Sequence, residues 1–441
     1  MKFIAQGGLN KTPLTGAIRV PGDKSISHRS IMFGALAEGK TKVTGFLNGE
    51  DNLATLNVFR SMGVDITDPD NGELEIKGVG MHGLQAPATE LDVGNSGTSI
   101  RLLSGLLSGA ISTKDFNVVL SGDRSLSKRP MKRVTDPLKS MGALVETNEA
   151  GTPPLTIHGG KTLKGIEYDM PMASAQVKSC LLLAGLYAEG KTCVTEPAPT
   201  RDHTERMLRG FGYEVESNNG TICLQGGGKL TATDIDIPAD ISSATFFMVG
   251  ACIAEGSDIT LEHVGINPTR IGVINILRLM GASIEILNQR DVGGEPVADI
   301  RVKSAKLKGI RIPENQVPLA IDEFPAIFIA ASCAEGETVL TGAEELRVKE
   351  SDRIQAMADG LNILGVDAKA TEDGIIIQGG NIGSGEVESH DDHRIAMSFA
   401  MAALVSDGPV TINECSNVAT SFPSFLDLAN QSGLKINSKT Q

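Results

Sequence analysis

The feature that most constrains the fold of this chain is an internal repeat that occurs six times. Each copy ends a helix with a short glycine turn and continues into alternating β-branched residues, as in "SMGVDI" and "LMGASIEI". The turn glycines are Gly63, Gly142, Gly212, Gly281, Gly365 and Gly433, and successive ones lie 68 to 84 residues apart. Glycine is favoured where a helix ends in a left-handed turn, and β-branched alternation predicts a strand.

A second recurring segment lies earlier in each copy. It is a small acidic-glycine turn after an apolar helix, as in "LAEGKTKVTG", "YAEGKTCVTE", "IAEGSDITLE" and "CAEGETVLTG". Each unit is therefore predicted to run helix, turn, strand, helix, turn, strand, with further strands after it. An ordinary solenoid repeats at roughly 20–50 residues, so the longer period favours a compact α/β protein. Its helices should be apolar on most faces, as "ATFFMVGACIA" is.

Composition limits the size, compartment and partners. A chain of 441 residues with 41% hydrophobic residues predicts two or more domains. A net charge of −14 argues against nucleic-acid and anionic-membrane partners. The six cysteines form no CxxC pair and no zinc-like array, which fits a reducing compartment. The start of the chain is too polar for a secretory signal, and the apolar runs are shorter than the ~20 residues of a membrane span. We therefore expect a cytoplasmic protein.

Basic residues recur where the predicted helices begin. In "VPGDKSISHRS" at residues 20–30, Ser25 or Ser27 is the expected N-cap. The basic residues at or near such starts are Lys24, Arg29, Arg101, Lys128, Arg129, Lys178, Arg201, Arg270, Lys349, Arg353 and Arg394. Helix N-termini suit anions, and a cation there opposes the helix dipole by ~0.3–1 kcal/mol. So many cations suggest a polyanionic ligand, although pairing with nearby Asp or Glu remains an alternative.

Three further segments are open to two interpretations. "GNSGTS" at residue 94 resembles a phosphate-binding loop but lacks the spacing of a nucleotide P-loop. Asp322 and Glu323 lie beside a strongly apolar helix, where a carboxylate is either functional or paired. Glu350 lies between Lys349 and Arg353, where a helix-capping role is equally open.

Eight motifs, taken together and in order, carry a family resemblance. They are "GDKSISHR", "GNSGTSIR", "SLSKRP", "SAQVKS", "RDHTE", "AIDEFP", "RVKESDR" and "DHRIAM". The chain from about residue 12 to 430 resembles the 5-enolpyruvylshikimate-3-phosphate synthase family. The resemblance implies an inside-out αβ barrel fold of two similar domains, each with three βαβαββ units. The implied domains are residues 22–237 and residues 1–21 with 238–441, with the active site in the cleft between them.

The resemblance also implies the reaction and its ligands. The enolpyruvyl group of phosphoenolpyruvate passes to the 5-hydroxyl of shikimate 3-phosphate, and phosphate is released. No metal or organic cofactor is expected, and the expected state is a monomer. The residues that match the phosphoenolpyruvate side are Lys24, Gly97, Arg129, Gln176, Arg353 and Arg394. Those that match the shikimate-phosphate side are Lys24, Ser25, Arg29, Ser174, Gln176, Arg201, Asp322 and Lys349.

The implied catalytic residues are Asp322, Glu350 and Lys24. Asp322 is the expected base for the 5-hydroxyl, with Glu350 and Lys24 as proton-transfer partners. How the last two divide that work remains open. An arginine suits these ligands because its planar fork binds carboxylate and phosphate through two hydrogen bonds.

The chain departs from many family members at two positions, with Leu102 in place of Pro and Thr420 in place of Lys. "GDKS", "SAQVK", "RDHTE" and "NPTR" resemble the second class of the family, which is known for tolerance of glyphosate, a competitor of phosphoenolpyruvate. The nearest alternative is the UDP-N-acetylglucosamine enolpyruvyl transferase of the same fold, which has a reactive Cys in the loop matching "SGDRSLSKRP"; this chain has none there. An RNA 3′-phosphate cyclase or a non-catalytic anion-binding protein of repeated αβ units are the more distant alternatives.

Overall fold

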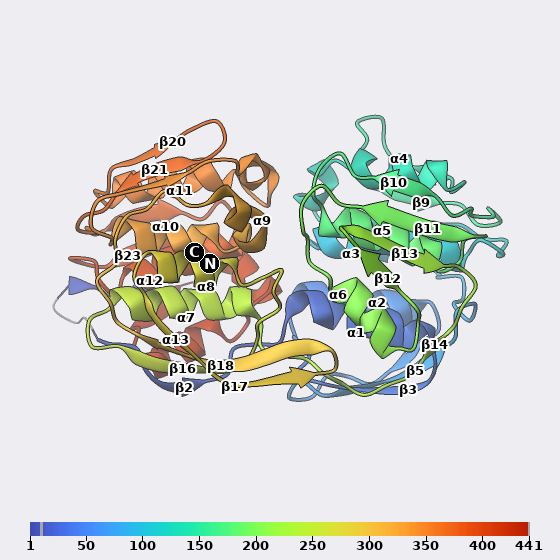
Figure 1. The fold of residues 1–441 in the computed structure, drawn as a ribbon, viewed down its shortest axis with the longest axis horizontal. Helices are drawn as coiled ribbons and strands as arrows, with labels where there is room; N and C mark the ends of the chain where they lie inside the picture. The colour runs from blue at the N-terminus through green and yellow to red at the C-terminus, as the bar shows by residue number, and fades with distance from the viewer. Residues whose placement is uncertain (9–11, 440–441) are drawn as a thin grey trace. The chain divides into compact units, whose positions relative to one another are not determined.

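The computed structural model describes residues 1–8 and 12–439. The chain packs into two compact units, which we describe separately (Figure 1). Unit 1 consists of Met1–Pro21 together with Pro238–Gln441, and unit 2 consists of Gly22–Ile237. The chain therefore passes from one unit to the other twice.

Unit 2 holds three sheets, each of which mixes parallel and antiparallel strands. The first has the order β14-β3-β5-β4, with β15 also paired to β3; the second is β6-β7-β9-β8; the third is β10-β11-β13-β12. Their strands are β3 (Ala37–Thr44), β4 (Asp65–Ile66), β5 (Leu74–Val79), β6 (Leu91–Asp92), β7 (Val118–Ser121), β8 (Val145–Glu146), β9 (Leu155–Ile157), β10 (Glu167–Asp169), β11 (Lys191–Thr195), β12 (Glu216–Asn218), β13 (Thr221–Gln225), β14 (Leu230–Thr231) and β15 (Ile235–Asp236). Each sheet is accompanied by two helices, which are α1 (Lys24–Leu36), α2 (Glu50–Ser61), α3 (Gly97–Ala110), α4 (Lys132–Ser140), α5 (Ala175–Gly185) and α6 (His203–Gly210).

The described part of unit 1 also holds three sheets, two of which mix parallel and antiparallel strands while the third, β19-β21-β20, is antiparallel. Its sheets have the orders β22-β23-β1-β24, β17-β18-β16-β2 and β19-β21-β20. Their strands are β1 (Lys2–Ala5), β2 (Thr15–Ile18), β16 (Asp258–Gly265), β17 (Ser283–Val292), β18 (Glu295–Lys303), β19 (Glu337–Leu340), β20 (Ala368–Ala370), β21 (Ile375–Gln378), β22 (Gly385–Glu388), β23 (Val410–Asn413) and β24 (Ile436–Lys439). The helices are α7 (Ile241–Ile253), α8 (Gly272–Leu279), the short α9 (Val317–Ala320), α10 (Phe324–Ser332), α11 (Arg353–Ile363), α12 (His393–Ala402) and α13 (Phe425–Ser432).

The six predicted repeats are confirmed at their turn glycines. Each of these glycines follows the second helix of its repeat and has a positive φ, between 80° at Gly212 and 127° at Gly433. A strand begins two to four residues later in every copy, from β4 after Gly63 to β24 after Gly433. The left-handed turn redirects the chain from the helix into the strand. Each glycine therefore stands at the same position of its repeat, and the spacing between glycines gives the repeat length.

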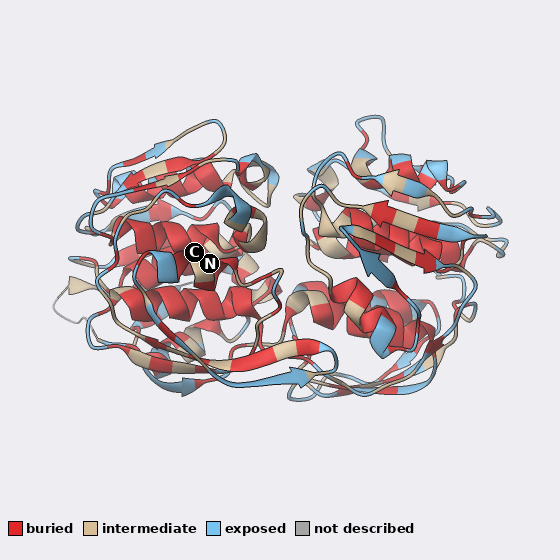
Figure 2. Ribbon diagram, in the orientation of Figure 1, coloured by how far each residue is buried: buried red, intermediate tan, exposed pale blue. Residues whose placement is uncertain are grey.

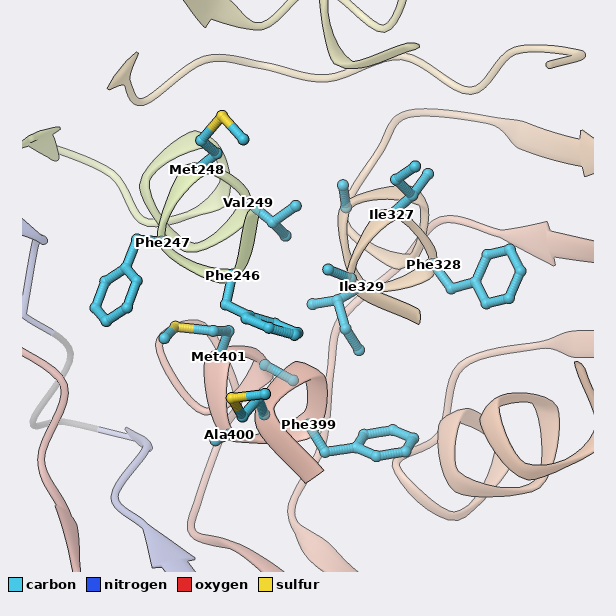
Figure 3. Packing of buried hydrophobic residues seen from close by; sticks show 14 of the residues in the cluster. Phe246, Phe247, Met248, Val249, Ile327, Phe328, Ile329, Phe399, Ala400 and Met401 are labelled. Atoms are coloured by element: carbon cyan, nitrogen blue, oxygen red, sulfur yellow. The ribbon is translucent and has the colours of Figure 1, made fainter. Parts of the chain in front are cut away.

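The first helix of each repeat is buried almost all round. Every residue of α7 from Ile241 to Cys252 is buried, and so are all but one of the residues of α3. Figure 2 shows α7 of unit 1 and α3 and α5 of unit 2 largely in red, the colour of buried residues. In unit 1, Phe246 of α7 points toward the space between α10 and α12 (Figure 3). A helix surrounded by apolar neighbours has no polar face, which explains the all-round hydrophobic sequences.

One local expectation was wrong, and one covalent contact was not expected. Asp23, not Ser25 or Ser27, caps α1, because its carboxylate accepts a hydrogen bond from the Ile26 amide at 2.8 Å. Cys193 of β11 lies directly opposite Cys223 of β13 and forms a disulfide with it. The partners are 30 residues apart and meet only through strand register, so cysteine spacing gave no sign of them. No helix among the described residues is both long and apolar enough to span a membrane.

The close approach of α3 and α5 in unit 2 predicts a sharp effect of one methyl group. A Cβ at Gly105 would lie 1.9 Å from the carbonyl oxygen of Cys180. Gly105→Ala should therefore destabilise the protein by about 1–3 kcal/mol through overpacking, and lower the midpoint of thermal unfolding. The control is Gly210→Ala, where nothing lies within 4 Å of the added atom and the midpoint should hold or rise. Equal midpoints for the two variants would contradict this interpretation.

Candidate active site

In unit 2, the first residue of α1 is fixed by two residues of α2. The Lys24 ammonium lies 2.6 Å from Asp51 Oδ2, and the Asn52 side-chain amide donates to the Lys24 carbonyl oxygen at 3.1 Å. Asp51 is buried. A buried carboxylate beside the ammonium offsets the unfavourable interaction of that charge with the start of its own helix. Both the ammonium and the backbone of Lys24 are therefore held in position by α2.

A buried polar network lies one turn further along α1. His28 Nδ1 lies 2.9 Å from Thr55 Oγ1 of α2, and Thr55 Oγ1 lies 2.6 Å from Ser99 Oγ of α3. Ser99 donates its hydroxyl to Ser96 at 2.8 Å, and Ser96 is the N-cap of α3. Burial, helped by the charges of Lys24 and Arg29, holds the pKa of His28 well below its ordinary value of 6.5. The neutral ring thus links α1 to the middle of α2 and, through Thr55, to the start of α3.

Cations and a glutamine crowd over Gly97 at the start of α3. A Cβ at Gly97 would lie 2.7 Å from Arg129 Nη1 and 3.1 Å from Arg101 Nη1. Arg101 donates to Gln176 Oε1 at 2.8 Å, and Gln176 donates to Thr98 Oγ1 at 3.1 Å. Gly97, Arg129 and Gln176 were assigned from the sequence to one ligand, and the structure brings them together.

Arg129 has a further fixed partner. Its Nη2 donates to Asn95 Oδ1 at 2.9 Å, and Asn95 in turn donates to Asp123 at 2.6 Å. The "GNSGTS" segment therefore supplies both the helix N-terminus and the amide that holds this arginine. A helix start with two guanidinium groups over a bare glycine is suited to a phosphate or carboxylate.

The remaining predicted residues of unit 2 gather around the starts of α1, α5 and α6. Ser174 is the N-cap of α5 and accepts from the Val177 amide at 3.4 Å. Arg29 is buried and donates to Thr204 Oγ1 at 2.7 Å, to Ser179 Oγ at 2.9 Å and to the Ser25 carbonyl oxygen at 2.9 Å. Arg201 lies in the loop that precedes α6 and is partly exposed.

Two of the eleven basic residues do not fit the prediction of a shared ligand. Lys178 is buried in unit 2, where its ammonium lies 3.0 Å from Glu196 and 2.7 Å from Glu205. Arg270 is buried in unit 1, where it lies 3.2 Å from Asp240 and donates to Ser242. For both residues the alternative of pairing with nearby carboxylates was correct.

In unit 1, Arg353 is the centre of the candidate site. It is 1% exposed and lies 2.8 Å from Asp392, 2.6 Å from Glu350 and 3.2 Å from Asp322. Burial acts to lower its pKa, but the three carboxylates outweigh burial and raise it. Burial likewise acts to raise the pKa of Asp392, but the charges of Arg353 and His393 and the hydrogen bond from Arg353 together outweigh it and leave that pKa below its ordinary value. The two catalytic carboxylates predicted from sequence therefore share one guanidinium.

Lys349 and Arg394 complete this cluster. Lys349 Nζ lies 3.6 Å from Asp322 Oδ1, and Arg394 donates from Nη1 to the Asp322 carbonyl oxygen at 2.9 Å. Asp392 is the N-cap of α12 and accepts from the Arg394 amide at 2.9 Å. Asp322 is thus contacted through its side chain by two cations and through its backbone by a third.

Sequence reasoning missed several residues of these clusters. Asp392 orients Arg353, Asp51 orients Lys24, and Ser242 donates to Glu323, the neighbour of Asp322. Asp392 was present in the "DHRIAM" motif, and an Asp directly before a predicted helix is a signal for an N-cap. Asp51 carried no such sign because its partner is 27 residues away in another helix.

The comparisons with known proteins agree on one family. The family model described as EPSP synthase (3-phosphoshikimate 1-carboxyvinyltransferase) matches residues 9–428. A 3-phosphoshikimate 1-carboxyvinyltransferase of Methylococcus capsulatus is 68% identical over 96% of this chain and 96% of its own length. One of Nitrosococcus oceani is 66% identical over 98% and 96%.

Solved structures show the same fold. An EPSP synthase from Acinetobacter baumannii matches with a TM-score of 0.89 and 62% identity, over 99% of this chain and 100% of that one. The enolpyruvyl transferase NikO from Streptomyces tendae matches with a TM-score of 0.75 at 17% identity, over 100% and 99%, which shows likeness of fold alone. The α/β fold class predicted from the repeats and the resemblance is confirmed.

The buried imidazole of unit 2 predicts a pH dependence of stability. His28 stays neutral in the folded protein because its pKa is lowered, whereas in the unfolded chain it takes up a proton below about pH 6.5. The unfolded state then binds more protons, so stability should fall as pH falls below 6.5, by up to about 1.4 kcal/mol per pH unit. In His28→Gln this contribution is absent. The midpoint of thermal unfolding should therefore change less between about pH 7 and about pH 5, on either side of the ordinary histidine pKa, than in the wild type. If the unfolding midpoints of the wild type and of His28→Gln changed equally with pH, the buried His28 would not be the source of the pH dependence.

Proposed function

The chain belongs to the EPSP synthase (3-phosphoshikimate 1-carboxyvinyltransferase) family, and we propose that the clusters of both units bind the two substrates of this reaction. The enzyme transfers the enolpyruvyl group of phosphoenolpyruvate to the 5-hydroxyl of shikimate 3-phosphate and releases phosphate. The residue assignment rests on two observations. In unit 2, cationic side chains that can bind an anion surround Gly97, and in unit 1, two carboxylates that can accept a proton contact Arg353.

Phosphoenolpyruvate carries a phosphate and a carboxylate, and so requires several cations. We assign it to Arg129, Gln176 and the bare backbone of Gly97 in unit 2, and to Arg353 and Arg394 in unit 1. Lys24 serves both substrates. Charge-assisted hydrogen bonds to such groups contribute about 1.5–3 kcal/mol each, which makes the cations the main source of affinity.

Shikimate 3-phosphate is assigned to the second set of residues. In unit 2 this set gathers at the starts of α1, α5 and α6, and in unit 1 it lies at Asp322. Its members are Lys24, Ser25, Arg29, Ser174, Gln176, Arg201, Asp322 and Lys349. The contact of Lys349 with Asp322 supports placing both residues on the same substrate.

The chemistry is an addition followed by an elimination. The 5-hydroxyl oxygen bonds to C2 of phosphoenolpyruvate, its proton passes to Asp322, and C3 takes up a proton to become a methyl group. The tetrahedral intermediate then loses phosphate from C2 and a proton from that methyl group, which restores the double bond. Glu350 and Lys24 are the groups assigned to the proton on C3.

Asp322 is oriented for its role by its neighbours. Arg353 and Lys349 contact its carboxylate at 3.2 and 3.6 Å, and Arg394 holds its carbonyl oxygen. Nearby cations favour the ionised form of a carboxylate, which is the form that accepts a proton. The expected location is cytoplasmic and the expected state a monomer; in a reducing compartment the Cys193–Cys223 pair would be a dithiol.

The direct test is phosphate release from phosphoenolpyruvate. We expect release only when shikimate 3-phosphate is present, with an enolpyruvyl ether as the second product. UDP-N-acetylglucosamine is the control acceptor and should give no release. Release with that sugar nucleotide, or with neither acceptor, would overturn the assignment.

Gly97 predicts how one methyl group changes specificity. In Gly97→Ala the added carbon would lie 2.7 Å from Arg129 Nη1, so the guanidinium must move away from the phosphoenolpyruvate side. One displaced contact is worth ~1–3 kcal/mol, so KM for phosphoenolpyruvate should rise about 5- to 150-fold. Inhibition by glyphosate should weaken as well, while KM for shikimate 3-phosphate changes little.

The control for this variant is Gly210→Ala, which adds the same methyl group in open space at the end of α6. It should leave both KM values unchanged. If Gly97→Ala kept the wild-type KM for phosphoenolpyruvate, Gly97 and Arg129 would not border that substrate.

A further inference from the structure

A buried ion triad in unit 2 lies directly behind part of the proposed shikimate-phosphate site. Lys178 of α5 is 0% exposed, and its ammonium lies 3.0 Å from Glu196 Oε2 and 2.7 Å from Glu205 Oε1. The side chains of the two carboxylates are 9% and 2% exposed. The ammonium therefore contacts the protein interior and does not face a ligand.

The two carboxylates stand at the two ends of one loop. Glu196 follows β11 directly, and Glu205 lies in the first turn of α6. The segment between them carries Arg201, which is assigned to shikimate 3-phosphate. Thr200, the residue before Arg201, donates its hydroxyl to Glu196 Oε2 at 2.5 Å. One ammonium thus fastens the loop at both ends, and one of its carboxylates also fastens the middle.

The triad also joins the loop to the other residues on the same side of the site. Lys178 lies one turn after Ser174, to whose carbonyl oxygen its amide donates at 3.1 Å. The next residue, Ser179, lies 2.8 Å from Thr204 Oγ1, and both hydroxyls accept from the Arg29 guanidinium. The starts of α1, α5 and α6 are therefore connected through contiguous buried contacts.

A buried ion triad adds little net stability, because desolvation offsets most of the attraction. The triad combines one ammonium with two carboxylates, and the Arg29 guanidinium donates to Thr204 and Ser179, the residues beside Glu205 and Lys178. The triad therefore contributes more to fixing the position of the loop than to the stability of the fold. On the basis of the proposed function, we propose that Lys178 is a positioning residue that acts through Glu196 and Glu205 to hold Arg201 for shikimate 3-phosphate.

The test variant is Glu196→Ala, because it leaves Lys178 paired one to one with Glu205 and so keeps the fold. Loss of the Glu196 carboxylate removes the hydrogen bond from Thr200 and the ion pair that holds the loop where it follows β11. KM for shikimate 3-phosphate should rise about tenfold, as expected for a loosened charge-assisted contact, while KM for phosphoenolpyruvate stays within about twofold. The matched control is Glu216→Ala, which breaks a 2.6 Å pair with Lys191 on the surface of the same unit and should change neither KM.

Amide hydrogen exchange of residues 198 and 200–204 provides a measurement that does not depend on turnover. Exchange there should be about tenfold faster in Glu196→Ala than in the wild type or in Glu216→Ala, because the loop opens more readily. If the wild-type protein did not turn over the two substrates, the proposed function would be overturned. The exchange measurement would still decide whether the triad holds the loop. Unchanged exchange, or equal rises in both KM values, would overturn the proposal.

Lys178→Met is the stronger variant, since it leaves two buried carboxylates without a cation. It should unfold at a lower temperature than Glu196→Ala. Where it folds, its KM for shikimate 3-phosphate should exceed that of Glu196→Ala. A folded Lys178→Met protein with wild-type KM values would contradict the positioning role.

Discussion

The complete burial of the first helix in each repeat is the constraint on which the site depends. Sheets and neighbouring helices cover α3 and α7 on almost every side. A hydroxyl in the middle of such a helix bonds back to the helix backbone, as Ser104 does to the Ile100 carbonyl oxygen, whereas the unpaired amides of the N-terminal turn require other partners. The cations, caps and carboxylates of both units therefore gather at helix starts, and the repeat that builds the core also places the chemistry.

Cations at helix starts create a cost that the structure offsets locally. The helix dipole repels them, and at two of these starts a buried carboxylate from another element faces the cation. Asp51 of α2 faces Lys24, and Asp392, the N-cap of α12, faces Arg353. These carboxylates do more than neutralise charge, because a hydrogen-bonded guanidinium or ammonium has one orientation. A ligand phosphate then meets donors that are already aligned, and little side-chain entropy remains to be lost on binding.

The sequence predicted the repeats, the fold class and most residues of the two clusters, because these depend on local patterns. Left-handed glycine turns and all-apolar helices are visible in a short window. What it could not supply were pairings across elements. Lys178 and Arg270 looked the same in the sequence as Lys24, yet only the fold shows that both are enclosed with carboxylates. The cap of α1 was misplaced by two or four residues because Asp and Ser are nearly equal as N-caps. The Cys193–Cys223 pair depends on strand register.

Local charge and net charge also have different consequences for function. The chain carries −14 overall, while both substrates are anions. At physiological ionic strength the screening length is about 8 Å, so carboxylates elsewhere on the surface have little influence on a ligand in contact with Arg129 or Arg394. The groups that matter are those within one or two contacts of the ligand, and in unit 1 these include Asp322 and Glu350 on the same Arg353. An anion that binds Arg353 must share it with both carboxylates. On the proposed assignment, an anion bound at Arg353 competes directly with the hydrogen bonds that this guanidinium donates to Asp322 and Glu350.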